Sequence, residues 1–407
     1  MRVFYLDPGL RNELGHHANW CRAIAGELRR RGIETKVYAF AEVVPALRAE
    51  LEAIGHFRYF PYRHFDPDPI CGWLTAFQTA AVTTAQDLAR LEVAADDLVY
   101  VNSAQPGPLF GVTQWLASRP ADRRPLVIVE FAFEPGLSAQ RDKGEFIFSV
   151  RDARQDPRAT LFRFTALQIP PALSPHLRFV TFDEACSAVY RMLLQRDVLA
   201  LPMPHRAVTS CRDRTGQRPI TIALLGHQRP DKGYELVPEI VRTLLAARQD
   251  VRFLIHNAAP GAMAATQQAL RQNAAASGRI EIEERVAGPA LLRELLERAD
   301  LVLCPYLPER YIASHSSVAA EALANAIPLV VPADTALAKQ LRDFGEPGTS
   351  FERFEPAAIA DATLRLLAEY DRYAGRAVEA AALWAGRHGP QHLVDGLLAL
   401  GRPGSER

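Results

Sequence analysis

The stretch "LLGHQRPDKGYELV", residues 224–237, joins a short apolar run to the start of a helix-like segment. The apolar run ends at Gly226, and polar or turn-forming residues follow it. Three basic or titratable side chains, His227, Arg229 and Lys232, therefore lie in one strand-to-helix turn. Free backbone N–H groups at the start of a helix, together with a mobile ammonium, suit a diphosphate. Taken alone, the turn favours the simpler interpretation of solvated charges, and the phosphate hypothesis needs a second motif.

Downstream of residue 219, strand-like and helix-like patterns alternate. The strand-like runs are ITIALLG, VRFLIH, IEIEERV, LVLCPY and PLVVP, and helical spacing covers 234–248, 265–276, 289–298, 317–325, 357–370, 371–386 and 391–400. Strands that alternate with helices form parallel sheets with helices on both faces. The pattern predicts a Rossmann-like domain over residues 219–385.

The amino-terminal half shows the same alternation. Its strand candidates are 2–6, 35–40, 98–102, 126–133, 177–182 and 198–201, and helical spacing covers 18–31. We expect a Rossmann-like domain over 1–202, a Pro-rich and polar linker over 203–218, and a C-terminal helix over 386–407, for which packing back on the first domain is left open. The predicted fold class is α/β, with two doubly wound, Rossmann-like domains that face each other across a ligand-binding cleft.

The composition excludes several classes of protein. The 407 residues carry 47 basic and 47 acidic side chains, so the formal net charge is zero and no nucleic-acid partner is expected. No stretch approaches the ~18 apolar residues of a membrane-spanning helix, and the first apolar run is too short for a signal peptide, so we expect a soluble, cytoplasmic protein. The cysteines are scattered without C-x-x-C spacing, which indicates reduced thiols and no zinc site: Cys21, Cys71, Cys186, Cys211 and Cys304.

A second motif lies in "PYLPERYIASHSSVAAEALANAIPLVVP", residues 305–332. A predicted strand ends at Tyr306, and a polar loop leads to a helix that begins near Ser316 and Ser317, both good N-cap residues. Free amides at that helix start would accept an anion. Glu321, one turn into the helix, is placed to accept hydrogen bonds from two vicinal hydroxyls, such as those of a ribose. A plain cap and a favourable acid near the helix N-terminus are the alternatives.

Together the two motifs resemble the C-terminal domain of GT-B glycosyltransferases, in particular the large retaining group called family 4, or glycosyl transferases group 1. That family carries a Gly-Arg-x-x-x-x-Lys-Gly loop whose Arg and Lys hold the donor diphosphate, and Gly226, Lys232 and Gly233 match its spacing. The segment "SHSSVAAEALANAIPLVV" matches a Ser-rich variant of the family's second motif. At the amino end, "LGHHANWCRAIAGELRRRGIETKVYAF" is similar to the first β-α-β unit of these enzymes.

The resemblance implies a hexosyltransferase-type enzyme (EC 2.4) that uses a UDP- or GDP-linked sugar as donor and acts with retention. It implies no prosthetic group and no metal, because basic side chains and a helix start stabilise the departing diphosphate. Inversion with His16 as base is left open. The donor-site candidates that the resemblance implies are Gly15, Gly226, His227, Arg229, Lys232, Gly233, Tyr306, Ser314, His315, Ser316, Ser317, Val318 and Glu321.

Three positions depart from the family pattern. His227 stands where the loop usually has Arg, so Arg229 is expected to supply the second cation. Ala313 replaces the first Glu of the second motif, and Ala326 replaces a Gly. Two other functions therefore stay open: a degenerate GT-B protein that binds a nucleotide or a protein partner without transfer, and a nucleotide-sugar epimerase of the same fold.

The amino-terminal domain offers candidates for catalysis and acceptor binding. His16, in the loop after the first strand, can deprotonate an acceptor hydroxyl near neutral pH, although a solvated or capping His is the alternative. Glu130 and Glu134 lie on one face at the end of a predicted strand, where either could orient the acceptor or act as base; for each, an ordinary strand-end carboxylate is the alternative. Asn102 and Gln105 are expected to contact the acceptor. A glycan, a lipid-linked, a protein or a small-molecule acceptor stays open, as does peripheral contact with the inner face of a membrane.

Overall fold

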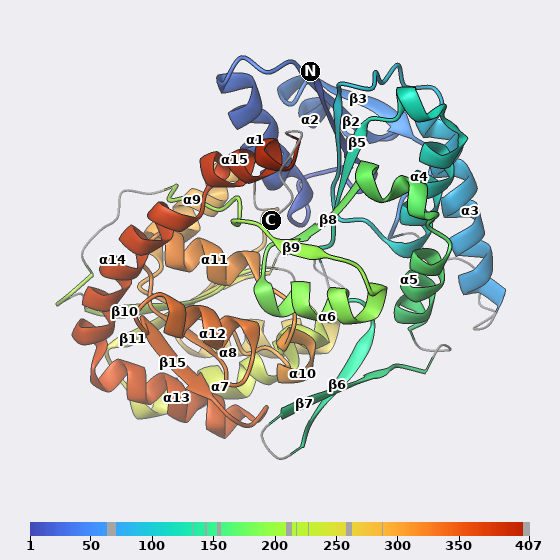
Figure 1. Cartoon of the computed structure of the whole chain (residues 1–407). Coiled ribbons are helices and arrows are strands. Elements are labelled where there is room, and N and C mark those ends of the chain that lie inside the picture. The colour runs from blue at the N-terminus through green and yellow to red at the C-terminus, as the bar shows by residue number, and fades with distance from the viewer. Residues whose placement is uncertain are drawn as a thin grey trace. The chain divides into compact units, whose positions relative to one another are not determined.

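The computed structural model describes residues 1–62, 71–132, 134–142, 145–152, 156–208, 214–216, 218–226, 228–257, 263–286 and 288–401 (Figure 1). Two compact units make up the chain. Unit 1 comprises Met1–Pro204 and Pro390–Arg407, and unit 2 comprises His205–Gly389. Each unit is built on its own parallel sheet.

Unit 1 contains a sheet of order β3-β2-β1-β4-β5-β8-β9, in which every neighbouring pair is parallel. Its strands are β1 (Val3–Asp7), β2 (Thr35–Phe40), β3 (Ala53–Phe57), β4 (Leu98–Val101), β5 (Leu126–Glu130), β8 (Leu177–Thr181) and β9 (Val198–Ala200). β1 and β4 are buried along their whole length, as expected for central strands covered on both faces. The carboxyl ends of β1, β4 and β5 therefore meet at one edge of the sheet.

The helices of unit 1 cover this sheet. They are α1 (His17–Arg30), α2 (Pro45–Glu50), α3 (Cys71–Leu88), α4 (Pro106–Ser118), α5 (Arg158–Leu167), α6 (Glu184–Leu194) and α15 (Pro390–Leu400), with 3₁₀ turns η1 (Ala121–Arg123) and η2 (Pro171–His176). An antiparallel hairpin, β6 (Leu137–Asp142) and β7 (Glu145–Val150), follows β5. α15 packs beside α1, where Arg31 donates to Asp395 at 2.5 Å and to the Gln391 carbonyl at 2.9 Å.

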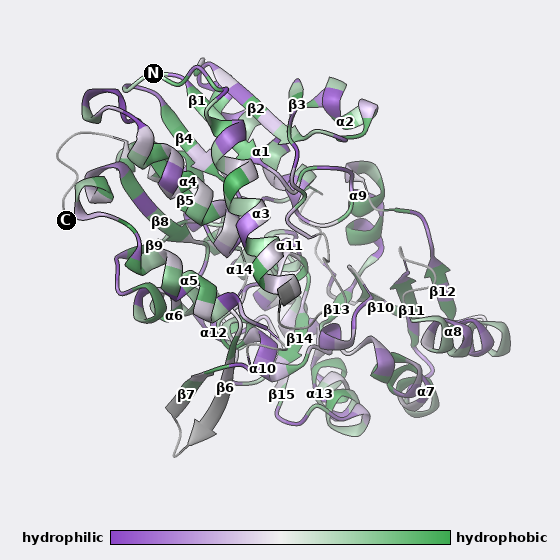
Figure 2. Ribbon diagram, turned by 90° about the vertical axis from the view of Figure 1, so that its right-hand side faces the viewer, coloured by the Kyte–Doolittle hydropathy of each residue, from purple (hydrophilic) through white to green (hydrophobic). Residues whose placement is uncertain are grey.

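Unit 2 contains a sheet of order β12-β11-β10-β13-β14-β15, again parallel throughout. Its strands are β10 (Ile220–Leu224), β11 (Val251–His256), β12 (Ile280–Glu283), β13 (Leu301–Leu303), β14 (Leu329–Pro332) and β15 (Gly348–Phe351). Its helices are α7 (Val237–Ala247), α8 (Ala264–Ala276), α9 (Pro289–Arg298), α10 (Pro308–Tyr311), α11 (Ser317–Ala324), α12 (Ala336–Asp343), α13 (Pro356–Ala368) and α14 (Tyr370–Arg387), with η3 (Pro230–Lys232) and η4 (Tyr234–Leu236). Figure 2 shows hydrophobic and hydrophilic residues on the turns of α7 and α8, a pattern typical of helices with one face against a sheet.

The α/β class with two Rossmann-like sheets, predicted from the sequence, is confirmed. The sequence patterns do not predict β3, β15 or the β6–β7 hairpin. β3 and β15 are short, contain Gly and are only partly buried, so neither gives a strong apolar run. The strand predicted for 126–133 ends at Glu130, and Phe133 lies outside the described residues, as do Cys211 and the last residues of the chain, 402–407.

Part of the stretch predicted to be a linker is fixed in unit 2. The guanidinium of Arg214 is buried there and donates to the carbonyls of Ala299 at 2.9 Å and Ala326 at 3.1 Å. Upstream of it, the Trp384 indole donates to the carbonyl of His205 at 2.9 Å. Within the described ranges, no helix combines the length and the apolar character that crossing a membrane requires.

Candidate functional site

The loop after β10 packs against the end of β13, so the two quoted motifs meet in unit 2. Gly226 and Gly233 both have left-handed backbones, with φ of 96° and 65°. A Cβ atom on Gly233 would lie 1.8 Å from the carbonyl oxygen of Pro305, a distance that only glycine permits. The amide of Leu307 also donates to the Asp231 carbonyl at 3.0 Å. These contacts bring Lys232 to the residues that follow β13.

Lys232 is the central cation of this loop. Its Nζ lies 5.5 Å from the centre of the Tyr306 ring, and a Cβ on Gly226 would lie 3.0 Å from the same Nζ. Burial lowers the pKa of Lys232 to about 8, and the charge of Arg229 acts in the same direction. Among the described residues, nothing forms a hydrogen bond or an ion pair with this ammonium. An anion that entered here would meet a half-buried charge that has no partner in the part of the chain the structure describes.

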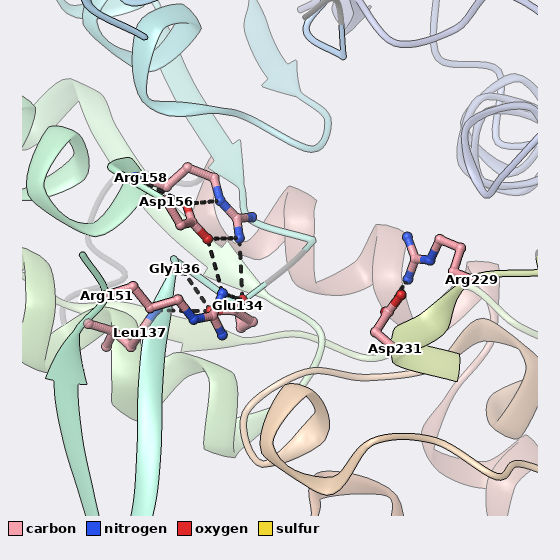
Figure 3. Close-up of polar contacts among 8 residues, drawn as sticks. All are labelled: Glu134, Gly136, Leu137, Arg151, Asp156, Arg158, Arg229 and Asp231. Carbon is pink, nitrogen blue, oxygen red and sulfur yellow. Dashed lines mark hydrogen bonds and ion pairs between the residues drawn. The ribbon is translucent and has the colours of Figure 1, made fainter. Parts of the chain in front are cut away.

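Arg229 differs from Lys232 because it already has a carboxylate partner. Its guanidinium donates to Asp231 at 2.7 Å, as Figure 3 shows, and 46% of its side chain is exposed. Asp231 comes from the same loop, so the pair forms within unit 2. His227, the third basic group predicted in this loop, lies outside the described residues.

The start of α11 lies against the same loop. Ser316 is its N-cap, and its Oγ accepts a hydrogen bond from the Ala319 amide at 3.3 Å. A Cβ on Gly226 would lie 3.1 Å from Cγ2 of Val318, which places the first turn of α11 beside Gly226 and Lys232. The amides of this turn, including that of Ser317, are therefore close to the ammonium.

Two titratable residues near the start of α11, His315 and Glu321, carry less charge at pH 7 than their residue types suggest. Ser314 and His315 are buried just before the cap, and burial lowers the pKa of His315 to about 4, so its ring is neutral at pH 7. Burial also raises the pKa of Glu321 to about 8, although the charge of Lys232 opposes this shift. No hydrogen bond joins the Glu321 carboxyl to any residue that the structure describes. Lys232 and Glu321 thus both lack a hydrogen-bond partner among the residues that the structure describes.

A small pocket lies directly behind the loop. Its polar lining includes residues that sequence reasoning missed: Gln228, Tyr234 and His256. Gln228 ties the loop to β11, because its side-chain amide donates to the carbonyls of Gly226, at 2.8 Å, and His256. In the sequence, the only indication that these residues line a pocket is their position at the ends of strands and in turns.

In unit 1, three polar side chains stand in a row at the carboxyl ends of adjacent strands. Asp7 ends β1, Asn102 follows β4 and Glu130 ends β5, and all three are buried. The Asn102 side-chain amide donates to Asp7 Oδ2 at 2.9 Å. The Ser103 amide donates to Glu130 Oε2 at 2.7 Å. The row thus contains Asn102 and Glu130, which the sequence predicted as site residues, and Asp7, which it did not predict.

The two histidines at the start of α1 have different partners. His16 Nε2 lies 2.7 Å from Ser103 Oγ. Its ring stacks on His17, with centroids 4.2 Å apart, and is tilted against Trp20, with centroids 4.0 Å apart. His17 Nδ1 lies 2.7 Å from Asp7 Oδ1, and its Nε2 lies 3.0 Å from the Tyr62 hydroxyl. The sequence analysis did not predict that His17 pairs with Asp7. The only indication of this pair in the sequence is an acidic residue at the end of the first strand. Gly15, just before His16, has φ of 86°.

The two glutamates predicted for catalysis lie in different surroundings. Glu130 is fully buried, and burial raises its pKa to about 8, so the carboxyl is mainly protonated at pH 7. Glu134 is instead the centre of a set of hydrogen bonds that Figure 3 shows. Its carboxylate accepts from Gly136 N (2.6 Å), Leu137 N (3.1 Å), Arg151 (2.9 Å) and Arg158 (3.3 Å). The same two arginines also pair with Asp156. Gln105 is the N-cap of α4, and its side chain makes no capping hydrogen bond.

Comparison with known proteins assigns the class. Residues 219–369 match the model of the family described as Glycosyl transferases group 1. No curated protein sequence matches the chain. A glycosyltransferase from Rickettsia africae and the sucrose-phosphate synthase of Thermosynechococcus elongatus each have a TM-score of 0.66, 12% identity and 98% coverage of both chains. Anabaena HepE, in its complex with UDP-glucose, has a TM-score of 0.62, 15% identity and 98% coverage of both chains.

The chain therefore has the fold of the GT-B glycosyltransferases. Residues 219–369 of unit 2, which include both quoted motifs, are similar to the group 1 glycosyltransferases. The resemblance read from those motifs is confirmed, whereas the roles of the individual site residues remain predictions.

Proposed function

We propose that the protein transfers a hexose from a nucleotide-diphosphate sugar to a hydroxyl acceptor, with retention of anomeric configuration. The observation that carries this proposal is the half-buried ammonium of Lys232, which has no partner among the described residues and lies beside Gly226 and the start of α11. A diphosphate supplies the negative charge that this arrangement lacks. The match of residues 219–369 to group 1 glycosyltransferases supports the same choice.

Each donor group has a distinct role in this proposal. Lys232, Arg229 and the first amides of α11 hold the diphosphate, and they stabilise the charge that grows on it as the bond to the anomeric carbon breaks. Glu321 accepts hydrogen bonds from the ribose hydroxyls, a role supported by the lack of a hydrogen bond from its carboxyl to any described residue. Gly226 leaves space for a phosphate next to Nζ of Lys232. UDP is the first nucleotide to test, because Anabaena HepE, of the same fold, binds UDP-glucose.

Unit 1 supplies the acceptor site in this proposal. Asn102 and Gln105 bind the acceptor. With retention, the acceptor oxygen attacks on the face from which the diphosphate departs, and a departing phosphate oxygen takes the hydroxyl proton; His16 takes that proton only in the inverting alternative. The acceptor oxygen forms a bond to the anomeric carbon, the bond from that carbon to the phosphate oxygen breaks, and its electron pair leaves with the nucleoside diphosphate. Glu134 has no part in this scheme, because its carboxylate is already saturated by two backbone amides and two arginines.

The experiment that tests the donor site is a calorimetric titration of UDP, GDP and their common sugars. The wild type, Lys232→Ala and Lys339→Ala are compared; Lys339 is an exposed lysine of the same unit that pairs with Asp343. We expect one nucleotide to bind the wild type and Lys339→Ala equally, and Lys232→Ala about 10- to 100-fold more weakly, as for a lost charge-assisted contact. Equal affinity in all three proteins would sink the placement of the site. Binding without release of UDP or GDP in the presence of acceptor hydroxyls would favour a protein that binds donors without transfer.

A further inference from the structure

The ammonium of Lys232 lies over the ring of Tyr306. Its Nζ is 5.5 Å from the ring centre, within the roughly 6 Å over which a cation is attracted to the negative face of an aromatic ring. Tyr306 is buried, and its amide donates to the carbonyl of Cys304 at 2.8 Å. The protein therefore fixes the ring, whereas no hydrogen bond or ion pair ties the ammonium to any residue that the structure describes.

A second tyrosine connects this ring to the other cation of the loop. Tyr311, the last residue of α10, is buried and stacks on Tyr306 with ring centroids 4.6 Å apart. Burial and the charge of Asp231 raise the pKa of Tyr311, whereas the nearby charge of Arg229 lowers it. The two tyrosines thus form one buried aromatic pair, with Lys232 over one ring and Arg229 close to the other residue.

An aromatic ring stabilises a cation in a different way from a carboxylate. A carboxylate occupies the N–H groups that a phosphate needs, as Asp231 does with Arg229 at 2.7 Å. The ring attracts the ammonium through its quadrupole, so it leaves the three N–H donors of a lysine available to oxygen ligands. Burial lowers the pKa of Lys232 to about 8 and so favours the neutral amine. The ring opposes that loss of charge without neutralising the ammonium.

We propose that Tyr306 is a positioning residue, whose ring holds the ammonium of Lys232 charged and in place for the donor diphosphate, with Tyr311 fixing the ring. The inference rests on the proposed function, in which Lys232 binds the diphosphate. Tyr306 acts through Lys232 and forms no bond to the phosphates. The charged and titratable groups that surround Lys232 from the adjoining elements remain when the ring is replaced; they are Arg229, Asp231, Cys304, Glu321 and His256.

Titration of the lysine side chains by NMR tests the ring without any ligand. The chain contains four lysines, so the signal of Lys232 can be assigned with Lys232→Ala. Tyr306→Leu should lower the pKa of Lys232 by about 0.5–1.5, because the charged form loses the attraction of the ring. Tyr306→Phe keeps a ring and should hold that pKa within about 0.3 of the wild-type value. Tyr373→Leu is the matched control, since that ring lies 5.6 Å from Arg372 on α14, and it should leave Lys232 unchanged.

Nucleotide binding gives a second readout, which a purely structural role would not move. UDP is titrated into the wild type and Tyr306→Leu by calorimetry at pH 6 and pH 8. Because the pKa of Lys232 is about 8, lowering it should cost little affinity at pH 6, and the ratio of the two Kd values should grow about 2- to 12-fold by pH 8. The ionisation of UDP and of Glu321 cancels in this ratio, since both occur with either protein. A ring that only packs the loop would give the same ratio at both pH values.

Two results would overturn the proposal: a pKa of Lys232 that is unchanged or higher in Tyr306→Leu, or a Kd ratio that does not depend on pH. Should Tyr306→Leu fail to fold, pentafluorophenylalanine at position 306 answers the same question. It keeps the shape of an aromatic ring while its fluorines withdraw the negative charge from the face, so the pKa of Lys232 should again fall. A wild type that binds neither UDP nor GDP, but in which the ring sets the pKa of Lys232, would contradict the proposed function and leave the hold of Tyr306 on the ammonium supported.

Discussion

Arg229 donates to Asp231 across 2.7 Å, so one of the two cations proposed to hold the diphosphate is already paired with a carboxylate of the same loop (Figure 3). Lys232, three residues further along, has no such partner among the described residues. A diphosphate that binds here competes with Asp231 for the guanidinium, because carboxylate and phosphate oxygens use the same N–H groups. We therefore expect Asp231 to lower the affinity of the loop for an anion.

Removing that carboxylate should strengthen nucleotide binding. Asp231→Asn keeps the backbone carbonyl that accepts the Leu307 amide, so the loop retains its shape. We expect about 3- to 10-fold tighter binding of UDP or GDP by calorimetry, since a negative charge near the phosphates is lost. Asp250→Asn is the control, because Asp250 pairs with Arg248 at 2.7 Å elsewhere in unit 2. Weaker binding by Asp231→Asn would show that the carboxylate orients Arg229 for the ligand and does not compete with it.

Much of the site follows from the sheets, which the sequence predicts. Parallel strands end at a common edge, so Asn102 and Glu130 could be placed together from the ends of two strand-like runs. Lys232 could likewise be assigned to a loop of unit 2, and Glu321 to the first turns of a helix of the same unit. Asp7 ends the first strand in the same row, but it was not predicted as a site residue. It precedes Pro8, and an acidic residue before proline is typical of a turn.

Other features depend on backbone angles and distant contacts that the sequence does not encode locally. The Ser103 hydroxyl meets His16 across 87 positions only because Ser103 is left-handed, with φ of 52°. The backbone of Ala326 is another feature that the sequence does not predict. This residue stands where the family usually has Gly, and its φ of 55° explains that preference. The hydrogen bonds of Glu134 arise because β5 ends at Glu130, so the predicted alternation does not reach it.

The closeness of Gly233 to Pro305 predicts a large cost for any side chain at this position. Gly233→Ala should destabilise unit 2 by about 3 kcal/mol or more, because the new methyl combines a strained φ with a clash against a carbonyl oxygen. Gly345→Ala separates the two effects, since its φ is 83° but no atom lies within 4 Å of the added Cβ. That variant should cost about 1 kcal/mol in urea unfolding. Equal losses in the two variants would contradict a close approach of the loop to β13.

Glu134 should matter for stability and not for the chemical step. Glu134→Gln leaves Arg151 and Arg158 with a single buried carboxylate, Asp156, and we expect a loss of about 3 kcal/mol in urea unfolding of unit 1. The exposed pair of Glu184 and Arg191 gives the control, because Glu184→Gln should cost less than about 0.5 kcal/mol. Loss of turnover in a Glu134→Gln protein of wild-type stability would restore Glu134 as a catalytic candidate.

The burial of Glu130 predicts a specific dependence of stability on pH. Its pKa is raised to about 8, from an ordinary 4.5, by burial and to a smaller degree by the charge of Asp7. Below the ordinary pKa the carboxyl is protonated in both the folded and the unfolded chain, so its stabilising contribution is fully present. As the pH rises toward 8, the unfolded chain ionises first, and that contribution is progressively lost.

Glu130→Gln removes this titration, because an amide does not ionise in the range. The free energy of unfolding of the variant should therefore gain on that of the wild type by about 3–5 kcal/mol between about pH 4.5 and pH 8.5. Urea unfolding at several pH values measures the difference, and other titrating groups such as Glu321 cancel because both proteins contain them. Glu42→Gln, at an exposed residue of unit 1, should show a difference that does not change with pH. A flat difference for Glu130→Gln as well would mean that the carboxyl ionises at its ordinary pKa, with Asp7 and the buried tyrosines rearranged around the charge.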